Sequence, residues 1–266
     1  MGILNVTPDS FYDGGRYAGK GRAVEKAFRI RDEGADIIDI GGESSRPGSR
    51  PVSAGEEMDR VCPVIEAIAL DLGIPISVDT TKSEVARAAL KAGASMVNDI
   101  SGLAFDERIA EAVAESGAGL VVMHMRGRPE TMQADPRYND LIGEIRGFLA
   151  GAVSRAIERG VDRSGIIVDP GIGFGKTMED NYRIIENLRE FRALGFPVLV
   201  GLSRKSLIGG LYDGEEDRLP ATLALNTVAI RNGADIIRVH DVREHRLALE
   251  GLEMLKRISE KDGRAG

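Results

Sequence analysis

The sequence alternates short apolar runs with longer amphipathic stretches, and it does so eight times. Most of the short runs are nearly continuous in Ile, Val and Leu, which is typical of parallel strands that are covered on both faces. A chain of repeated β-then-α units folds as a closed barrel or as an open doubly wound sheet. The strands that we expect are Ile3–Val6, Asp36–Ile40, Pro75–Asp79, Met96–Asp99, Gly119–Met123, Ile166–Asp169, Val198–Gly201 and Ile236–Val239.

Amphipathic helices are expected between these strands. Several stretches end in a glycine followed by Ala or Val, where glycine supplies the left-handed residue that stops a helix. These glycines are Gly34, Gly93, Gly117, Gly160 and Gly233. The clearest helical stretches are Ala54–Asp71, Lys82–Ala92, Glu144–Arg159 and Asp217–Asn232.

The chain contains no low-complexity segment and no proline-rich linker, so one domain is expected. Its 266 residues suit a (β/α)8 barrel, which typically needs roughly 250. The sequence therefore predicts an α/β fold with a single TIM (β/α)8 barrel over residues 1–266, ending in a disordered tail at about 259–266.

The formal net charge of −7 argues against nucleic acid as the main partner. An anionic substrate would need a local basic pocket. No apolar run approaches the roughly 18 residues that cross a membrane, and the first residues lack the pattern of a signal peptide. The lone cysteine, Cys62, excludes an internal disulfide bond. We therefore expect a cytoplasmic protein with no membrane or nucleic-acid partner.

Polar residues occur at nearly all the expected strand ends. In (β/α)8 barrels the βα loops gather at the carboxyl ends of the strands, and the chemistry takes place there. One or two polar residues would be expected at these positions by chance, whereas so many indicate a site. They include Asn5, Glu43, Asp79, Asn98, His124, Asp169, Lys205, Arg238 and His240.

Three of these residues, Asp79, Asn98 and Asp169, are short acceptor or amide side chains that should converge from three strands. A carboxylate that faces an amino-pyrimidinone edge accepts two parallel N–H bonds, and an amide completes the pattern as donor and acceptor. A helix N-cap or an ion pair would explain any single Asp equally well. The three together favour ligand recognition.

A basic group is expected across the mouth of the barrel from these acceptors. It consists of Arg204, Lys205, Arg238 and His240, which suit phosphate oxygens. Solvated surface charge is the alternative, but it is less expected directly after a buried strand. For His124, which stands alone after its strand, a hydrogen-bonded structural role is favoured.

The glycine-rich segment 169–177, DPGIGFGKT, resembles two nucleotide-binding patterns and matches neither. The phosphate-binding loop of nucleotide triphosphatases needs four residues between its first Gly and Gly-Lys-Thr, whereas Gly171 and Gly175 are separated by three. The dinucleotide fingerprint has a different glycine spacing. Such a segment still lets a flat ligand approach the backbone, with Phe174 available to stack or to pack.

Eight stretches, in order and each at a strand end, resemble the dihydropteroate synthase family. The likeness runs from residue 2 to about residue 250, which makes it highly specific. The stretches are MGILNVTPDSFYDGG, DIIDIGGESSRPG, ISVDTTK, VNDISG, VVMHMRGRPETMQ, DPGIGFGK, GLSRKSLIG and RVHDVREH.

The resemblance implies a site for each of two substrates. A pterin would bind deep in the barrel at residues matching Asp79, Asn98, Asp169, Phe174 and Lys205. Its diphosphate would bind at Asn5, Asp13, Arg46, Arg238 and His240, with Mg²⁺ near Asn5. The p-aminobenzoate pocket would consist of Phe11, Ser45, Arg46, Pro47, Phe174, Lys205 and Ser206.

The implied reaction displaces diphosphate from a CH2 group on an electron-rich dihydropterin. The carbon ionises first, and the aromatic amine then attacks the delocalised cation, so that no covalent nucleophile is needed. Asp13, Lys205, Arg238 and His240 match the residues expected to take part in catalysis. Physical reasoning agrees at one further point, since Ser206 opens an expected short helix whose free N–H groups could bind the aminobenzoate carboxylate.

The sequence departs from the family pattern at a few positions. Ser45 stands where Thr is common, so the hydroxyl is kept and a methyl contact with the aminobenzoate is lost. Tyr12 and Ile172 replace Ser and Phe or Met at little expected cost. The family's leader before the first strand is not present in this sequence, which we expect to affect stability and not chemistry. Family members are usually homodimers and sulfonamide targets, and we expect both properties here.

Three alternatives remain at this point. A methyltetrahydrofolate:corrinoid methyltransferase binds a pterin in such a barrel but needs no diphosphate site, so Arg238 and His240 argue against it. A barrel aldolase would use Lys205 as a Schiff-base amine, which borohydride trapping would reveal. A non-catalytic pterin-binding barrel would bind the diphosphate substrate without releasing diphosphate.

Overall fold

The computed structural model of the chain describes residues 1–7, 15–46, 48–203, 205 and 218–262. In this part of the chain, strands alternate with helices. The strands are β1 (Gly2–Asn5), β2 (Ile38–Gly41), β3 (Ile76–Asp79), β4 (Met96–Asp99), β5 (Gly119–Met123), β6 (Ile166–Asp169), β7 (Leu199–Val200) and β8 (Ile236–Ile237). The helices are α2 (Gly15–Asp32), α3 (Ala54–Ile68), α4 (Ser83–Lys91), α5 (Arg108–Ser116), α6 (Leu141–Glu158), the 3-10 helix η1 (Arg163–Gly165), α7 (Met178–Glu186), α8 (Leu188–Arg192), α10 (Arg218–Arg231) and α11 (Val242–Asp262).

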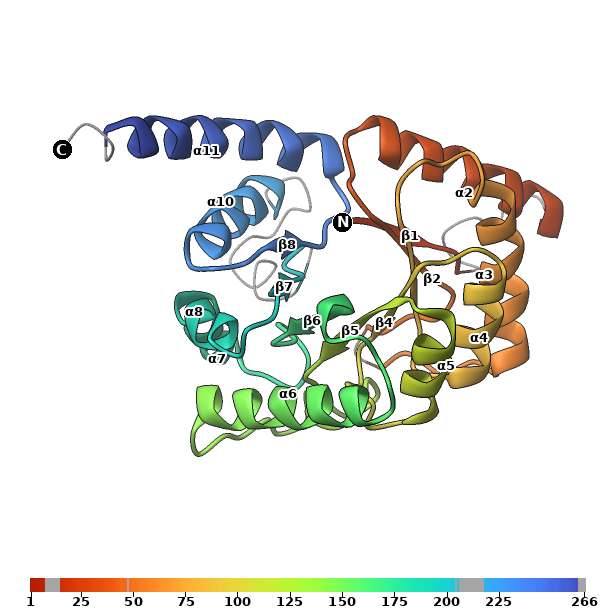
Figure 1. The fold of residues 1–266 in the computed structure, drawn as a ribbon, viewed down its shortest axis with the longest axis horizontal. Helices are drawn as coiled ribbons and strands as arrows, with labels where there is room; N and C mark the ends of the chain where they lie inside the picture. Colours follow the sequence, from red (N-terminus) through yellow and green to blue (C-terminus); the bar gives the residue numbers. More distant parts are fainter. Residues whose placement is uncertain (8–14, 47, 204, 206–217, 263–266) are drawn as a thin grey trace.

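The strands form a parallel barrel. β1 to β6 pair in sequence order in one sheet, and β7 pairs with β8. Single bridges join the two sheets: Val168 N donates to Pro197 O at 3.0 Å, and Ile3 N donates to Val239 O at 2.9 Å. The helices surround the strands on the outside (Figure 1). The predicted (β/α)8 barrel is confirmed.

The strands and the helix-ending glycines of the structure agree closely with the predicted ones. β4, β5 and β6 begin and end at the predicted residues. β7 and β8 are shorter than predicted because Val198 and Val239 make single bridges to the neighbouring sheet instead of extending the ladder. All of the glycines predicted to stop helices have positive φ angles, between 68° and 118°: Gly34, Gly93, Gly117, Gly160 and Gly233.

Among the described residues the apolar core falls into three clusters. Two of them lie on opposite sides of the sheet, because successive residues of a strand face opposite sides. On β5, Leu120 and Val122 face the helices and belong to the large core between helices and strands. Val121, between them, lies in a smaller cluster that fills the barrel interior with Met1, Ile167 and Leu199.

The last helix corrects one prediction. α11 continues to Asp262, so residues 259–262 are helical and the disordered tail predicted at 259–266 is wrong over this part. Residues 263–266 lie outside the described part of the chain. None of the helices that the structure describes is long and apolar enough to cross a membrane.

Two glycines with positive φ provide a matched test of the helix stops. A Cβ added to Gly93 would lie 2.5 Å from Ala69 Cβ, whereas one added to Gly73 would meet nothing within 4 Å. Gly73→Ala should therefore cost only the backbone strain, about 1–2 kcal/mol. Gly93→Ala should cost about 1–3 kcal/mol more because α3 and α4 must move apart. Equal losses of unfolding free energy in urea would contradict this packing.

Candidate functional site

Strand register places three polar side chains on one rim of the barrel. Asn5 pairs with Gly41, Gly41 with Asp79, and Asp79 with Asn98, so these residues form one row across β1 to β4. A Cβ on Gly41 would lie 3.8 Å from both Asn5 Oδ1 and Asp79 Oδ2. The glycine therefore leaves an open space between an amide oxygen and a carboxylate at the carboxyl ends of the strands.

Arg238 binds two carboxylates at this rim. Its Nε donates to Asp39 Oδ2 at 2.6 Å and its Nη2 donates to Asp79 Oδ2 at 2.8 Å. Asn98 Nδ2 donates to the same Asp39 oxygen at 3.1 Å. We predicted Arg238 across the mouth from the acceptors, but it contacts Asp79 directly. The physical reason is that β8 lies next to β1 in the closed ring, so the residue after β8 reaches the side chains of β2 and β3.

Burial changes the protonation of this network. It raises the pKa of Asp79 to about 7, although the Arg238 charge opposes the shift. Burial also disfavours the charged form of Arg238, but Asp39 and Asp79 raise the guanidinium pKa overall. Arg238 is therefore a permanent cation, whereas Asp79 exchanges a proton near neutral pH.

Asp169 and Lys205 form the opposite part of the rim. Asp169 Oδ1 accepts from Gly171 N at 2.7 Å. Lys205 Nζ donates to Ile172 O and lies 4.5 Å from the centre of the Phe174 ring. Burial raises the pKa of Asp169 and lowers that of Lys205 to about 8, and their mutual attraction opposes both shifts. The arrangement offers a carboxylate and an amine beside an aromatic face.

The glycine-rich segment after β6 packs directly against the backbone after β5. A Cβ on Gly171 would lie 1.8 Å from His124 O, and one on Gly175 would lie 2.4 Å from Arg126 O. Both glycines also have positive φ, at 70° and 66°. Glycine is therefore required at these positions for packing between two loops, and the resemblance to a phosphate-binding loop has no functional meaning here.

Lys176, at the end of this segment, points inward and is only 2% exposed. Its Nζ donates to the carbonyls of Gly171, Phe174 and His124 at 2.8, 3.0 and 3.3 Å, and it lies 3.0 Å from His124 Nδ1. Burial lowers its pKa well below the usual value. Lys176 thus fixes the loop that carries Phe174.

His124 has the structural role that its sequence position favoured. It is 6% exposed, and its ring meets the Phe148 ring edge-on with centres 5.0 Å apart. Burial, together with the charge of Lys176, lowers its pKa to about 3, so the imidazole is neutral at physiological pH. Its neutral Nδ1 accepts from the lysine.

His240 lies over the ends of β7 and β8. Its Nδ1 is 3.0 Å from Ser203 Oγ, and its backbone N–H donates to the same hydroxyl at 3.2 Å. Ser203 is 5% exposed. The buried hydroxyl therefore orients both the ring and the backbone of His240.

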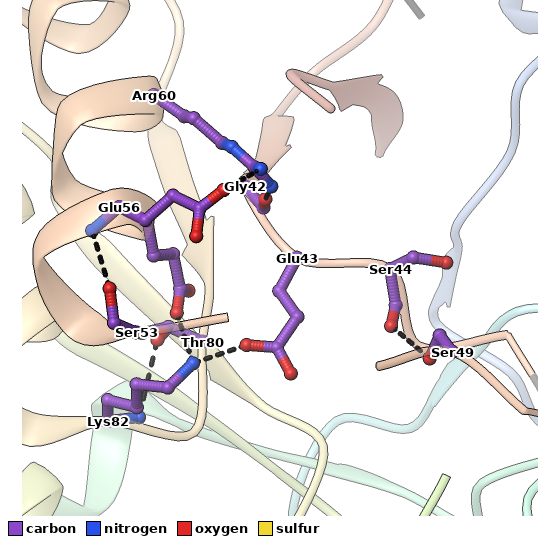
Figure 2. Close-up of polar contacts among 10 residues, drawn as sticks. Gly42, Glu43, Ser44, Ser49, Ser53, Glu56, Arg60, Thr80 and Lys82 are labelled. Atoms are coloured by element: carbon purple, nitrogen blue, oxygen red, sulfur yellow. Dashed lines mark hydrogen bonds and ion pairs between the residues drawn. The ribbon is translucent and has the colours of Figure 1, made fainter. Parts of the chain in front are cut away.

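The segment between β2 and α3 carries Ser45 and Arg46. Figure 2 shows Gly42, Glu43 and Ser44 at the start of this segment. Ser49 Oγ donates to Ser44 O at 2.5 Å, which closes a tight turn around these two residues. Ser45 is half-buried and Arg46 is exposed. A cavity of about 340 Å³ extends from Ser45 to Asp79.

The structure brings together most of the predicted residues that it describes: Asn5, Asp79, Asn98, Asp169, Phe174, Lys205, Arg238 and His240 around the rim, with Ser45 and Arg46 at its edge. Phe11, Asp13, Pro47, Arg204 and Ser206, together with the short helix expected from Ser206, lie outside the described residues.

Sequence reasoning missed Asp39 and Lys176. Asp39 is fully buried on β2, two residues before Gly41 and so on the same inward face. An acidic residue inside an apolar strand was a signal that could have revealed it. Lys176 gave no comparable signal, because a lysine after glycines is usually exposed or binds phosphate.

A parallel barrel whose strand ends bring together carboxylates, an amide and cations is an enzyme site for a small polar heterocycle. Residues 1–240 match the model of a family described as pterin binding enzyme. The dihydropteroate synthase of Synechocystis sp. PCC 6803 is 51% identical over 91% of this chain and 84% of its own length.

Solved structures agree with this match. A dihydropteroate synthase from Clostridium difficile, crystallised with pteroic acid, has a TM-score of 0.90 and 43% identity over 96% of this chain and 95% of its own. The Xanthomonas albilineans dihydropteroate synthase with 4-aminobenzoic acid has a TM-score of 0.89 and 43% identity over 96% and 92%. The chain belongs to the pterin-binding enzymes, in the dihydropteroate synthase family. It is a transferase that acts on small molecules, and the methyltransferase and non-catalytic alternatives are not favoured.

The pKa of Asp79 gives a testable prediction about stability. The pKa of Asp79 is about 7 in the folded protein, and its ordinary value is 3.8. Between these two pH values the folded protein keeps a proton on Asp79 that the unfolded chain has released. Wild-type stability should therefore fall, relative to Asp79→Asn, as the pH rises from about 4 to 7. Urea unfolding at several pH values measures this difference.

The Asp135→Asn variant is the control for the substitution itself, because that side chain is exposed. A difference for Asp79→Asn that does not change with pH would show that Asp79 is ionised throughout.

Proposed function

We propose that this protein condenses 6-hydroxymethyl-7,8-dihydropterin diphosphate with p-aminobenzoate, giving 7,8-dihydropteroate and diphosphate. The observation that carries the proposal is the meeting of Asp79, Asn98, Asp169 and Lys205 on one rim in a chain half identical to dihydropteroate synthases. The relatives crystallised with pteroic acid and with 4-aminobenzoic acid support both halves of the reaction.

The pterin would bind at the strand ends. Asp169 is 5% exposed and keeps one oxygen on Gly171 N, so its orientation is set before a ligand arrives. A carboxylate held this way can accept N–H bonds from the amino-pyrimidinone edge of the pterin. Asn98 and Asp79 would complete the set, with Lys205 donating to a ring acceptor.

Arg238 and His240 would bind the diphosphate. The Nε of Arg238 bonds to Asp39, and this bond would hold the guanidinium while Nη2 exchanges Asp79 for an oxygen of the anion. His240 is oriented by Ser203. Both residues would stabilise charge on the departing group, and such fixed dipoles and charges are a large source of rate.

Magnesium fits this arrangement through Asn5. No group of three or more His, Cys, Asp or Glu suited to hold a metal occurs among the described residues. Mg²⁺ does not require one, since it keeps several waters and binds through one or two protein oxygens and substrate phosphates. Asn5 Oδ1 is such an oxygen at the rim. Bound there, the ion would neutralise charge on the diphosphate.

The chemistry would need no covalent link to the protein. The C–O bond to diphosphate breaks, and the resulting cation is delocalised over the dihydropterin. The amine of p-aminobenzoate forms the new C–N bond and then loses a proton. The protein contributes by holding the amine in line with the carbon and by stabilising the departing anion.

The p-aminobenzoate would lie between the rim and the β2–α3 segment. Phe174 offers an aromatic face with the Lys205 ammonium over it, and Ser45 borders the cavity that reaches Asp79. Arg46 follows Ser45 in the same segment. Phe11, Pro47 and Ser206 are the further residues that we expect to line this pocket. We also expect the protein to be cytoplasmic and to form a homodimer. Sedimentation at several protein concentrations would measure the oligomeric state.

The reaction is tested by diphosphate release from the dihydropterin diphosphate. We expect release that depends on both p-aminobenzoate and Mg²⁺, together with formation of 7,8-dihydropteroate. Binding of the pterin substrate without release would favour a non-catalytic barrel. Chelation of the metal should abolish turnover and leave binding of the bare pterin alcohol unchanged, because the ion is assigned to the diphosphate.

Asp169→Asn should weaken pterin binding by about 2–4 kcal/mol with the fold intact. The amide can still accept from Gly171 N, but it cannot accept two N–H bonds as a carboxylate does. Calorimetry with a pterin fragment measures the loss, and the exposed Asp135→Asn variant is the matched control. An unchanged affinity for the pterin fragment would show that Asp169 does not contact the pterin.

A further inference from the structure

Three charged side chains form a cluster next to the candidate site. Lys82 Nζ donates to Glu57 Oε2 at 2.6 Å and also to Glu43 Oε2. Lys82 precedes α4, Glu57 lies on α3, and Glu43 lies in the β2–α3 segment. Figure 2 shows Lys82 reaching across to Glu43 from the side of Thr80. One ammonium therefore links three elements.

The cluster holds the segment that carries Ser45 and Arg46 at its base. Glu43 is near the start of this segment, and Glu57 lies in the helix that follows its end. Arg60 Nη1 donates to Gly42 O at 2.7 Å, which adds a second link between α3 and the start of the segment.

Packing at Gly42 supports the same conclusion. A Cβ there would lie 2.9 Å from Val61 Cγ1 and 3.2 Å from Glu57 O, so the backbone lies directly on the helix. The base of the segment is thus fixed by packing and by charge. Its outer part makes local bonds and one bond to the loop after β5, from Gly48 N to Pro129 O at 3.2 Å.

Lys82 is protonated at neutral pH. Burial acts to lower the pKa of Lys82, but its hydrogen bonds to Glu43 and Glu57 raise it overall. Burial raises the pKa of Glu57, and the lysine opposes this. The Glu57 side chain is 1% exposed, whereas Lys82 and Glu43 are about one quarter exposed. Lys82 is therefore the counter-charge that a buried carboxylate requires.

The position of the cluster indicates that it acts on the β2–α3 segment more than on the stability of the whole protein. A partly exposed pair such as Lys82 with Glu43 contributes little to overall stability. The same pair fixes the backbone two residues before Ser45, and the cavity that reaches Ser45 is lined by Glu43, Glu57 and Lys82 as well. Its main effect falls on where Ser45 and Arg46 lie.

We propose that Lys82 is a positioning residue for p-aminobenzoate, which holds the β2–α3 segment against the site through Glu43 and Glu57. This inference rests on the proposed function, in which Ser45 and Arg46 contact that substrate. The lysine touches neither substrate. It acts by keeping the segment in one place. Binding of p-aminobenzoate then does not have to order the segment, and its affinity is not reduced by that entropic cost.

The test compares Lys82→Met, Lys82→Arg, Glu43→Gln and the double variant Lys82→Met/Glu43→Gln. Lys82→Met should raise the KM for p-aminobenzoate about tenfold, a difference of about 1.4 kcal/mol. Its kcat and the Kd of the pterin diphosphate, measured without the second substrate, should stay within about threefold of wild type. Lys82→Arg, which keeps the charge, should restore most of the loss.

The double variant tests the contact itself. Because both changes break the same link, the double variant should be no worse than Lys82→Met. Glu43→Gln alone leaves the buried Glu57 paired, so it folds as wild type and should still raise the KM about threefold. Lys91→Met, an exposed lysine on α4, is the matched control and should change nothing.

Three results would overturn the inference. The first is an unchanged KM in both Lys82→Met and Glu43→Gln. The second is an equal loss of pterin affinity, which would show that the cluster only supports the barrel.

The third result comes from the double variant Ser45→Ala/Arg46→Ala, which tests directly whether the segment forms the p-aminobenzoate pocket. An unchanged KM for p-aminobenzoate in that variant would show that the segment does not form the pocket, and the inference fails with that assignment. A raised KM there, with no change in Lys82→Met, would reject only the role of Lys82.

Discussion

One buried and one partly buried acidic residue, together with one arginine, determine the geometry of this barrel rim. Asp39 is fully buried and holds both Arg238 and Asn98 through a single oxygen, and Arg238 in turn binds Asp79. Removing one partner of such a network leaves an uncompensated charge, which is strongly destabilising. The network therefore fixes the residues of β2, β3 and β4 relative to the end of β8 before any ligand binds. Under the proposed function, Arg238 can exchange Asp79 for phosphate oxygens while Asp39 still anchors its Nε.

A second fixed unit lies across the rim and uses a different interaction. Lys176 satisfies three backbone carbonyls and His124 in a space where Gly171 and Gly175 permit two loops to touch. The desolvation of the lysine disfavours its charge, as the direction of its pKa shift shows. Several short bonds to carbonyl oxygens compensate in place of an ion pair. The result is a rigid loop that presents Phe174 to Lys205.

The fold and much of the rim could be predicted because both depend on local patterns. Parallel strands appear in the sequence as apolar runs, helix stops require glycine, and polar residues at the carboxyl end of each strand lie at the mouth of the barrel. Asp79, Asn98 and Asp169 were found in this way. The direct contact of Arg238 with Asp79 could not be found, because it depends on closure of the ring between β8 and β1. Lys82 was missed for a similar reason, since its partners come from two other elements of the barrel.

The two halves of the site differ in what holds them, and this difference has a functional consequence. The pterin half rests on strand residues whose charges are buried, so a displacement there would break strong interactions. The aminobenzoate half includes a segment held by one partly exposed lysine and by short hydrogen bonds. The Lys82–Glu43 pair is partly exposed, and such pairs contribute little to overall stability. Under the proposed function, loss of that pair would shift Ser45 and Arg46 without disturbing the strands that carry the pterin contacts. We infer that changes in the Lys82 cluster would act on the second substrate alone, whereas changes in the Asp39 network would affect both.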